Sequence, residues 1–585
     1  MTVINRDHKP TNAELAQTFR LIGDLLELKG ENIYKISAYR KAADTIEVAT
    51  EDISSLWREN KLKELPGVGE AIAAKIAEIM DSGHLQFLDK LEEEVPPDLV
   101  GLLSLPGVGA KTAMFLYQKL GIKGVGELEA AAREGRVAQI PGMGQKKEAA
   151  LLKAIESSRA LSNDEVLLGI ALPCARQLMQ ALTAAYPTLN SVQVTGPLRR
   201  GRETVDMIDL VATSEEPAEV LEAFVKLPAL AKVNKRKDYK VNATLKNGLT
   251  VEILSVYPEQ LATTLALTTG SDGHRSQLRD LAYKRGYELS LGGFIKGEEV
   301  WPAKSEEEVF QYLGLPLIPP ELREGQDEVK KAVAGELALD LVTLADLQGD
   351  LHSHSVWSDG QNTVEQMARA AAMRGYRYLL MSDHSKSLGM VRGLTEERLQ
   401  EQQAEIAHIN EVLAAEGFDF RLLSGAEVEI KADGALDFAD EVLATMDIVV
   451  ASLHSSLRQE GAKITDRLLR AMHNPHVDII AHPTGRLINS RQPAALNMLK
   501  VFVAARETGT VLEINAGPDR LDLKAEHIQA ALQEKVKLVI SSDSHNISSL
   551  ANIEYGVITA RRGGCRATDI LNTLSLGQLL ENLKH

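Results

Sequence analysis

The chain has 585 residues, of which 44% are hydrophobic and 25% charged, an ordinary globular composition that is too long for one hydrophobic core. Its formal net charge of −17 argues against broad, nonspecific nucleic-acid binding, and its two cysteines argue against disulfides or a thiolate metal site. We expect no membrane-spanning segment and no leader sequence, and therefore a cytoplasmic protein.

Residues 10–160 carry aliphatic residues at three- and four-residue spacing, which predicts helices. One phrase, apolar–Pro–Gly–apolar–Gly before a helix, occurs three times there, from Leu65, Leu105 and Ile140. Its glycines permit a tight turn, and the N–H groups at the next helix start suit a phosphate oxygen. The phrase resembles the helix-hairpin-helix motif of DNA repair proteins, and its threefold recurrence disfavours three ordinary capping turns.

The hairpin residues and the lysines after them are the candidate DNA-binding groups. These are Gly67, Val68, Gly69, Gly107, Val108, Gly109, Gly142, Met143, Gly144, Lys111 and Lys146, with Lys147 beside the last. Groups of this kind contact phosphates and not bases, so the motif predicts binding to the DNA backbone without regard to base sequence.

From about residue 165 to 320 the sequence predicts strands. They are SVQVTG, MIDLVAT and VNATLKNGLTVEILSV, the last with a hairpin turn at Asn247-Gly248. The stretch LGLPLIPPELREGQDEVKK, with paired prolines, predicts a linker. After it, strands alternate with helices to the end, as in a βα barrel.

The side chains that could carry chemistry lie late in the chain, since 11 of 14 histidines stand at or after position 352. Most candidate metal ligands end short apolar runs such as YLLMSDH and IVVASLH. In a βα barrel, residues that follow successive strands converge on one mouth. The nine candidates are His352, His354, Asp359, His384, Glu427, His454, His482, Asp543 and His545.

Histidine nitrogens mixed with carboxylate oxygens suit Mn²⁺, Zn²⁺ or Fe²⁺ better than Mg²⁺ or Ca²⁺ alone. Such a cluster favours phosphoester hydrolysis. We expect Asp383 to orient an imidazole, and Arg392, Arg486 and Arg520 to bind phosphate or to form salt bridges. The histidines expected to be ordinary core or surface residues are His408, His473, His476 and His527.

The order of the parts resembles one family. The segment LKGENIYKISAYRKAADTIE precedes the hairpins, and VTGPLRRGRETVDMIDLV, TTGSDGHRSQLRDLAYKRGY, IPPELREG and the histidine-rich barrel follow. This series resembles, over nearly the whole chain, the bacterial family X DNA polymerases that carry a C-terminal polymerase-and-histidinol-phosphatase (PHP) domain. The domains that the resemblance implies are a helical 8-kDa-like domain (1–95), a fingers-like helix-hairpin-helix domain (96–162), a nucleotidyltransferase-like palm (163–262), a thumb (263–318), a linker (319–345) and a PHP distorted βα barrel (346–585).

The resemblance also implies a function. All nine candidates match PHP ligand positions, which in that family hold three ions, here Mn²⁺ or Zn²⁺, with Glu427 and Asp543 among the shared ligands. The implied activity is a 3′→5′ exonuclease on gapped, 3′-recessed or abasic duplex DNA, with processing of abasic sites or blocked 3′ ends. We expect a monomer with no membrane partner.

The palm departs from the family pattern, which runs Gly-Ser-x-Arg-Arg, Glu-Thr, Asp-x-Asp. Pro197 replaces the serine, Met207 stands at the first aspartate and Glu252 at the third, while Arg199, Arg200 and Asp209 remain. Two Mg²⁺ ions about 3.5–4 Å apart need carboxylates on the same strand face. Asp206 lies three residues before Asp209, so only a β-bulge would align them. Arg275 replaces the family's asparagine at the nucleotide.

We therefore expect a degenerate polymerase site, with Mg²⁺ bound there only if it still functions. A working gap-filling polymerase with an attached 3′→5′ exonuclease is the main alternative. A small-molecule phosphatase and a non-catalytic DNA-binding scaffold are the others. The resemblance further makes Lys75, near Lys35 and Tyr39, a candidate Schiff-base nucleophile, although an ordinary solvated lysine is favoured there.

Overall fold

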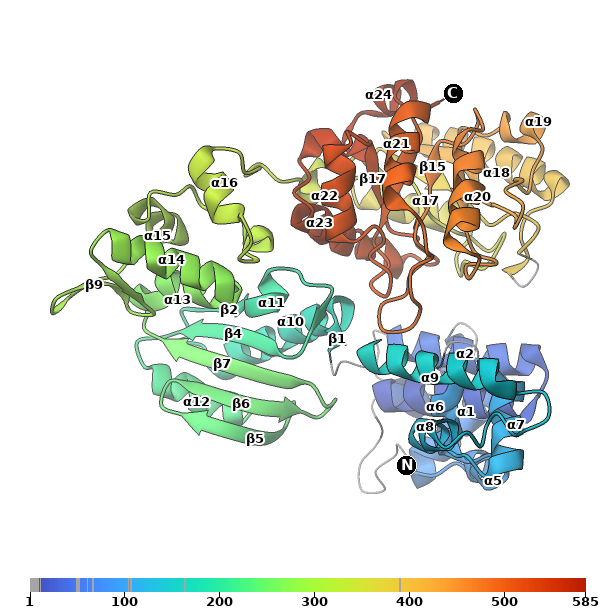
Figure 1. Ribbon diagram of the computed structural model, residues 1–585, viewed down its shortest axis with the longest axis horizontal. Coiled ribbons are helices and arrows are strands. Elements are labelled where there is room, and N and C mark those ends of the chain that lie inside the picture. Colours follow the sequence, from blue (N-terminus) through green and yellow to red (C-terminus); the bar gives the residue numbers. More distant parts are fainter. Residues whose placement is uncertain are drawn as a thin grey trace. The chain divides into compact units, whose positions relative to one another are not determined.

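The computed structural model describes residues 10, 12–48, 53–59, 61–65, 68–103, 105, 108–161, 165–388 and 391–584. They belong to two compact units, Met1–Asn163 and Asp164–His585 (Figure 1). Within these residues no helix is both long enough and apolar enough to cross a membrane.

The first unit is helical over its described residues. Its helices are α1 (Asn12–Lys29), α2 (Ile33–Val48), α3 (Ile53–Arg58), η1 (Leu62–Glu64), α4 (Glu70–Ser82), α5 (Gln86–Glu94), η2 (Pro97–Leu99), α6 (Val100–Leu103), α7 (Ala110–Leu120), α8 (Val125–Arg133) and α9 (Gly144–Leu161). Buried side chains from Leu15 to Ile155 form a single cluster, so the helical segments expected at 1–95 and 96–162 share one core.

The second unit begins with a five-stranded sheet, the palm, in the order β2-β4-β7-β6-β5. Its elements are β1 (Val166–Leu167), α10 (Leu168–Ala185), β2 (Ser191–Thr195), α11 (Gly196–Arg199), β3 (Thr204–Val205), β4 (Ile208–Thr213), α12 (Pro217–Val225), β5 (Leu230–Lys237), β6 (Lys240–Leu245) and β7 (Thr250–Val256). The predicted hairpin is confirmed, because β6 and β7 pair antiparallel around Gly248, whose φ of +88° suits its tight turn. The sequence did not predict β5, an edge strand with almost every residue exposed.

A smaller α+β region, the thumb, follows the palm. It contains η3 (Pro258–Gln260), α13 (Leu261–Thr269), α14 (Asp272–Lys284), β8 (Glu288–Ser290), β9 (Gly293–Lys296), β10 (Glu299–Trp301) and α15 (Glu306–Tyr312). The stretch expected as a linker, 319–345, contains η4 (Pro320–Leu322), the helix α16 (Glu328–Ala334) and part of η5 (Leu344–Asp346). Val329 and Ala332 of α16 are buried in the thumb's hydrophobic cluster.

The rest of the second unit is the predicted βα barrel. Its seven strands lie in chain order, and each pairs in parallel with the next. They are β11 (Gly349–Asp350), β12 (Tyr378–Met381), β13 (Arg421–Glu429), β14 (Ile448–Ser452), β15 (Ile479–Ile480), β16 (Val511–Asn515) and β17 (Leu538–Ser541). A parallel bridge between Ser353 and Ser544, just beyond β11 and β17, nearly closes the ring.

Helices cover the outside of this barrel (Figure 1). They are α17 (Val364–Met373), α18 (Glu396–Ala415), α19 (Asp440–Leu443), α20 (Gly461–Met472), α21 (Met498–Thr508), α22 (Ala525–Gln533), η7 (Ser548–Asn552) and α23 (Ile553–Arg562). The chain ends with η8 (Ala567–Asp569), η9 (Leu571–Thr573) and α24 (Leu576–Glu581). Leu579 of α24 is fully buried in a cluster with strand residues such as Tyr378 and Ile448, and the Tyr378 hydroxyl donates to the Leu574 carbonyl over 3.0 Å. The C-terminal segment therefore fills part of the barrel core.

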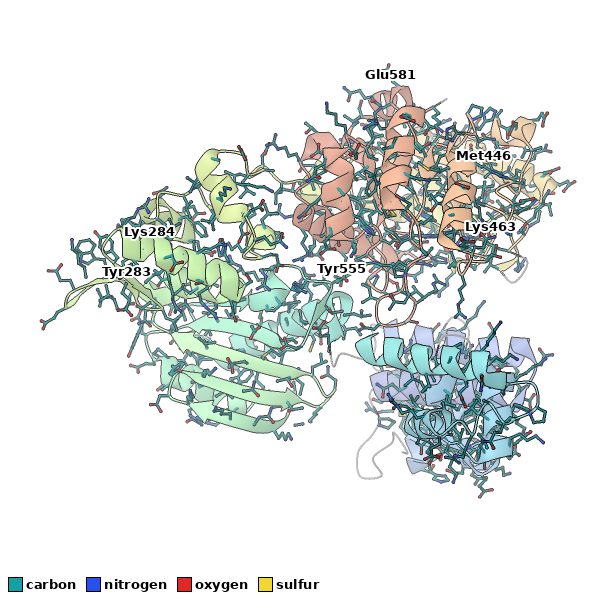
Figure 2. The ribbon with its side chains drawn as sticks, in the orientation of Figure 1. Tyr283, Lys284, Met446, Lys463, Tyr555 and Glu581 are labelled. Atoms are coloured by element: carbon teal, nitrogen blue, oxygen red, sulfur yellow. The ribbon has the colours of Figure 1, made fainter. Side chains whose placement is uncertain are left out.

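Replacement of Leu579 should test this packing. We expect Leu579→Ala to destabilise the barrel by about 2–4 kcal/mol, because it leaves a cavity among fully buried side chains. Glu581→Ala, on the exposed side of the same helix (Figure 2), should change stability by less than about 0.5 kcal/mol. Urea unfolding followed by circular dichroism measures both. Equal effects of the two substitutions would contradict this role of α24.

Candidate functional site

The carboxyl ends of the barrel strands bring all nine predicted ligands together. His352 and His354 follow β11, and His384 follows β12. Glu427 lies in β13, and the others follow β14, β15 and β17 or, for Asp359, lie in the loop after β11. These side chains meet because the carboxyl ends of all the parallel strands lie at the same end of the barrel. Only Asp359, His454, Asp543 and His545 keep partial solvent exposure, and the other five are buried.

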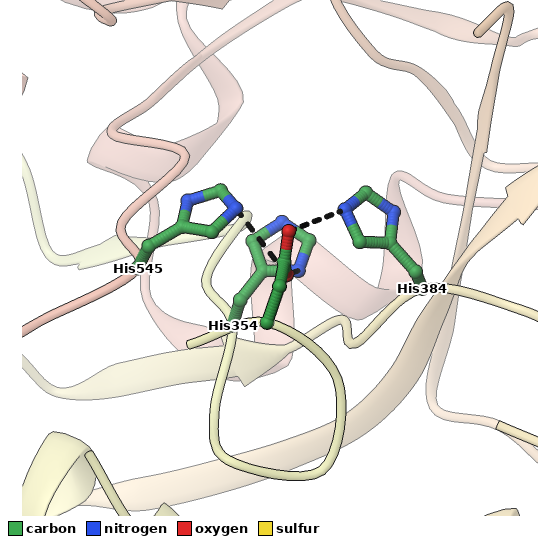
Figure 3. A group of neighbouring side chains, drawn as sticks. His354, His384 and His545 are labelled. Atoms are coloured by element: carbon green, nitrogen blue, oxygen red, sulfur yellow. Dashed lines mark ion pairs between the residues drawn. The ribbon is translucent and has the colours of Figure 1, made fainter. Parts of the chain in front are cut away.

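Three overlapping groups of these side chains have the spacing of metal ligands. In one, the His354 Nε2 and His352 Nε2 atoms lie 3.2 and 3.6 Å from Asp543 Oδ1. In another, His384 Nε2 and His545 Nε2 lie 3.6 and 3.4 Å from the Asp359 carboxylate (Figure 3). Two donors each about 2.0–2.2 Å from one ion lie about 3.3–3.6 Å apart at a tetrahedral angle.

The third group surrounds Glu427, which reaches four imidazoles. Its Oε1 lies 3.2 Å from His454 Nε2 and 3.0 Å from His482 Nε2. Its Oε2 lies 2.9 Å from His384 Nδ1 and 3.3 Å from His352 Nε2. One carboxylate thus faces two neighbouring groups of ligands, as a shared ligand would.

Several atoms at the centre of this cluster are buried but have no hydrogen-bond partner. They include both oxygens of Glu427, both ring nitrogens of His354 and Nε2 of His352. Buried polar atoms are normally satisfied, and each exception calls for a physical explanation such as an ion. The donor set, the spacing and these unpartnered atoms all fit several divalent cations.

Burial and mutual charge set the protonation of the cluster. Burial raises the pKa of Glu427, but the imidazoles of His454, His384 and His352 outweigh it and hold the pKa well below its usual range. Burial, with the neighbouring imidazoles, lowers the pKa of His354 to about 3. Burial lowers the pKa of His384, but Glu427 and Asp359 outweigh it and raise it to about 10. Without an ion, Glu427 is therefore ionised, His354 is neutral and His384 is protonated, and a metal that bound to His384 would displace its proton.

Two glutamates that the sequence reasoning missed orient the imidazoles from behind. Glu513 in β16 lies 2.7 Å from His352 Nδ1 and accepts the His482 backbone N–H over 2.6 Å. Glu429 in β13 lies 3.1 Å from His454 Nδ1. Such carboxylates fix the ring orientation of a ligating histidine. A glutamate inside an apolar strand, as in VLEIN, was the available signal.

The expectation that Asp383 orients an imidazole is wrong. Its carboxylate accepts hydrogen bonds from Ser355, Ser358 and Gln402 over 2.5–3.1 Å. Because it follows a strand directly before His384, its side chain points to the opposite side, where it fixes the loop that carries His354 and Asp359.

Two ligands occupy strained backbone. Asp543 and His482 have φ of +54° and +28°, a region that non-glycine residues rarely adopt. Such strain persists only where surrounding contacts determine it, and it is concentrated at functional sites.

The three predicted arginines have different surroundings. Arg520 is at the cluster, with Nε 3.9 Å from Asp543 Oδ2 and a buried Nη1 that lacks a hydrogen-bond partner. Arg486 forms a salt bridge with Glu203 of the palm, at 2.7 and 3.1 Å. Arg392 is exposed. Arg486 was expected either to bind phosphate or to form a salt bridge, and the structure shows the salt bridge.

The palm holds three acidic groups close together. Asp209 in β4 pairs in register with Glu252 in β7. Asp206 and Met207 lie in the bend before β4, where Asp206 is exposed and Met207 is partly buried. Burial, Glu252 and Asp206 raise the pKa of Asp209 to about 7. Glu252 is paired with Lys240 Nζ at 2.7 Å. Among the described residues, no palm carboxylate belongs to a group of three metal-ligand atoms.

The palm arginines are also bound by acidic side chains. Arg199 pairs with Glu306 of the thumb at 2.5 Å, and Arg200 lies 3.3 Å from Glu324 and donates to the Thr269 carbonyl over 2.8 Å. Arg275 pairs with Asp272 on its own helix. Pro197 lies in the first turn of α11, after Gly196, whose φ of +63° lets the backbone lie against the Asp209 carboxylate.

The hairpin turns in the first unit have the expected geometry where they are described. Gly69 and Gly109 directly precede α4 and α7 and are exposed, and neither helix start has a side-chain cap that would satisfy its first N–H groups. The apolar residue of each phrase is buried as an anchor, in the order Val68, Val108 and Met143. Gly67 and Gly107 lie outside the described residues.

The third turn has a different backbone. Gly142 and Gly144 have φ of +90° and +59°, and α9 begins at Gly144. The Lys147 ammonium donates to the Gly142 carbonyl over 2.8 Å, while Lys111 and Lys146 are exposed. The turns therefore present backbone N–H groups beside free cations.

Lys75 lies beside aromatic rings in the same unit. Its Nζ is 4.8 Å from the centre of the Phe87 ring, which Lys35 also approaches to 5.7 Å. The Tyr39 ring stacks on the Phe87 ring with their centres 5.8 Å apart, and burial raises the pKa of Tyr39 to about 12. The three residues that the resemblance placed together are therefore neighbours, and Phe87 links them.

Comparison with known proteins finds relatives for several segments of the chain. Four family models match: a helix-hairpin-helix domain (10–85), a SAM-like helix-hairpin-helix tandem (100–157), the DNA polymerase beta thumb (264–324) and the PHP domain (350–517). A protein of Thermoanaerobacter sp. (strain X514) named "Probable phosphatase" is 28% identical over 251 residues, which are 40% of this chain and 94% of that protein. A protein of Acetivibrio thermocellus with the same name is 29% identical over 34% of this chain and 78% of its own length.

One relative matches nearly the whole chain. The protein of Bacillus subtilis (strain 168) named "DNA polymerase/3′-5′ exonuclease PolX" is 39% identical over 581 residues, which are 99% of each chain. With the barrel, the thumb and the helix-hairpin-helix segments in the same order, the chain belongs to the PolX family, the bacterial family X DNA polymerases that carry a C-terminal PHP domain.

Proposed function

We propose that this chain is a metal-dependent DNA-repair nuclease whose PHP barrel hydrolyses DNA phosphodiester bonds from the 3′ end. The single observation that carries the proposal is the largely buried cluster of nine candidate ligands with nitrogens and oxygens at its centre that lack hydrogen-bond partners among the described residues. DNA as the substrate rests on the 3′-5′ exonuclease in the name of the Bacillus subtilis relative and on the helix-hairpin-helix segments. The expected substrates are gapped, 3′-recessed or abasic duplexes, acted on by a cytoplasmic monomer.

The nine ligands would hold Mn²⁺ or Zn²⁺, with Glu427 and Asp543 shared between ions, and the groups of the cluster suggest three. Bound ions of this kind lower the pKa of water and neutralise phosphate oxygens. Glu513 and Glu429 keep His352 and His454 oriented for this task. Arg520, with an unpartnered Nη1 beside Asp543, is the group that would bind a phosphate oxygen of the substrate.

The helix-hairpin-helix turns would bring DNA to this site. The starts of α4 and α7 offer free N–H groups and Lys111, which suit phosphates without regard to base sequence. A lyase role for Lys75 is the weakest part of the proposal, because its Nζ is within hydrogen-bond distance of the Ala71 carbonyl, 3.3 Å away, as an ordinary helix lysine can be.

The palm would contribute little or no polymerase activity. Lys240 already neutralises Glu252, Asp209 is half protonated near pH 7, and Met207 offers no oxygen to Mg²⁺. The competing proposal, a working gap-filling polymerase with an attached exonuclease, has one observation in its favour. Asp206, Asp209 and Glu252 are close enough that both neighbours raise the pKa of Asp209.

Removal of a barrel ligand should separate catalysis from binding. We expect His354→Ala or Asp543→Asn to abolish release of nucleotides from 3′-recessed DNA while DNA affinity stays within about twofold, because the hairpin turns lie elsewhere in the chain. Asp209→Ala is the matched control and should barely change the nuclease rate. A large loss of nuclease activity in Asp209→Ala would contradict the division of labour between palm and barrel.

Primer extension on gapped DNA tests the palm directly. With Mg²⁺ or Mn²⁺ and all four deoxynucleotides, the His354→Ala protein should extend a primer weakly or not at all. This variant removes the competing exonuclease. Robust Mg²⁺-dependent extension would replace our proposal with the gap-filling polymerase.

The raised pKa of Asp209 predicts a pH-dependent effect on stability. A carboxyl whose pKa rises from 3.8 to about 7 on folding contributes stability below pH 4 and loses it as the pH rises toward 7. In metal-free buffer, the melting temperature of Asp209→Asn minus that of the natural protein should therefore increase as the pH is raised from 5 to 8. A difference that does not vary with pH would contradict the raised pKa, and Mg²⁺-induced stabilisation that the variant lacks would favour the polymerase.

A further inference from the structure

Two loops at the barrel mouth are joined to each other. One follows β15 and starts with the ligand His482, and the other follows β16 and carries Arg520. Thr484 donates through its N–H and its hydroxyl to the Asp522 carboxylate, both over 2.9 Å. The Ile488 N–H donates to the Asp519 carbonyl over 2.7 Å. A shift of either loop would therefore move the other.

The second loop depends on the palm for its conformation. Leu521 has a φ of +44°, an unfavourable value for a leucine, and its side chain is 1% exposed in the palm's hydrophobic cluster together with Tyr555 of α23 (Figure 2). On the same loop, Pro518 lies so close to Gly169 of α10 that a Cβ on that glycine would be 2.3 Å from the proline Cβ. A strained residue of this kind keeps its conformation only while its surroundings hold it.

A palm carboxylate completes the contact through one arginine. Glu203, in the turn before β3, binds the Arg486 guanidinium with both oxygens, at 3.1 and 2.7 Å. The same guanidinium donates to the Leu521 carbonyl over 2.5 Å. Arg486 is mostly buried, and a two-oxygen contact fixes the plane of a guanidinium as well as its position. Glu203 thus fixes the donor that holds the residue next to Arg520.

We propose that Glu203 is a positioning residue of the nuclease: through Arg486 and Leu521 it keeps Arg520 beside Asp543, where a substrate phosphate would lie. The palm thereby acts as part of the scaffold of the barrel's active site, independently of any polymerase chemistry. The inference rests on the proposed function, in which Arg520 binds phosphate.

The matched control is a second ion pair between palm and barrel. Arg176 of α10 binds Glu554 of α23, with one oxygen at 3.0 Å, and among the described residues neither side chain forms a hydrogen bond or ion pair with the two loops. The substrate is bis(p-nitrophenyl) phosphate with Mn²⁺, a small phosphodiester whose hydrolysis does not depend on DNA contacts of the palm or hairpins. Melting temperature and bound Mn²⁺ are measured on every variant.

We expect Glu203→Gln to lower kcat/KM by about 10-fold, the lower end of the effect of removing a residue behind an active-site group. Arg176→Gln should change it by less than about twofold, as for an exposed ion pair. Bound Mn²⁺ should be unchanged in both. Equal losses in the two variants would mean that the interface matters only for general stability and would overturn the inference.

A double-mutant cycle with Arg520→Ala gives the decisive result. If Glu203 acts through Arg520, Glu203→Gln should cause no further loss in the Arg520→Ala background, because the group that it positions is already gone. Additive losses would overturn the positioning role while leaving the nuclease proposal intact. Full activity of Arg520→Ala would overturn the phosphate role of Arg520 and this inference with it, and absence of hydrolysis by the natural protein would overturn the proposed function itself.

Discussion

The barrel mouth gathers nine ionisable side chains in a space where most are closed to water. Burying carboxylates and imidazoles whose polar atoms lack hydrogen-bond partners among the described residues costs free energy, which bound cations would offset. The surrounding structure reflects that constraint. Glutamates behind the histidines fix ring orientation, and two of the nine candidate ligands, His482 and Asp543, have unfavourable backbone angles.

The palm also brings acidic groups together, but there most of them are paired with basic side chains. There the charges find partners inside the protein: Lys240 binds Glu252, and the arginines beside the Gly196 turn bind Glu306 and Glu324. Asp209, which has no cation in direct contact, is driven toward its neutral form by burial and by its acidic neighbours. A site whose charges are already neutralised by its own side chains has less affinity for Mg²⁺, whereas unpartnered donors increase affinity. This contrast supports the proposal that the chemistry lies in the barrel.

The same palm is joined to the barrel by a set of arginines. Glu324, just after the thumb, binds Arg200 of the palm and Arg562 of α23, and Glu321 binds Arg561 at 2.6 Å. Glu203 and Arg486 add a contact that reaches the active-site loops. Because these pairs are mostly part-buried and two of them, Glu203–Arg486 and Glu321–Arg561, are bidentate, they fix orientation more than exposed ion pairs do. In the proposed function, the palm would in this way support the barrel even with a weakened catalytic site.

Local pattern was sufficient to predict much of this protein. Apolar runs that end in His or Asp predicted both the parallel strands and the ligands after them, because the carboxyl ends of such strands meet at one mouth. Turn residues predicted the hairpin at Gly248, and the repeated glycine phrase predicted the helix starts after Gly69 and Gly109. The order of the parts predicted the family, which the Bacillus subtilis relative confirms.

Only the tertiary structure decided the rest. The edge strand β5 carries mostly exposed charged residues and so lacks the alternation that marks a strand. Glu513 and Glu429 orient histidines that are distant in sequence, while Asp383 points away from the imidazoles because neighbouring residues of an extended chain face opposite sides. Arg486 is paired with Glu203, which lies 283 residues earlier in the chain. The physical reason is common to all of these: periodicity and turn chemistry act over a few residues, whereas the partner of a charge is whichever group the fold brings within a few ångströms of it.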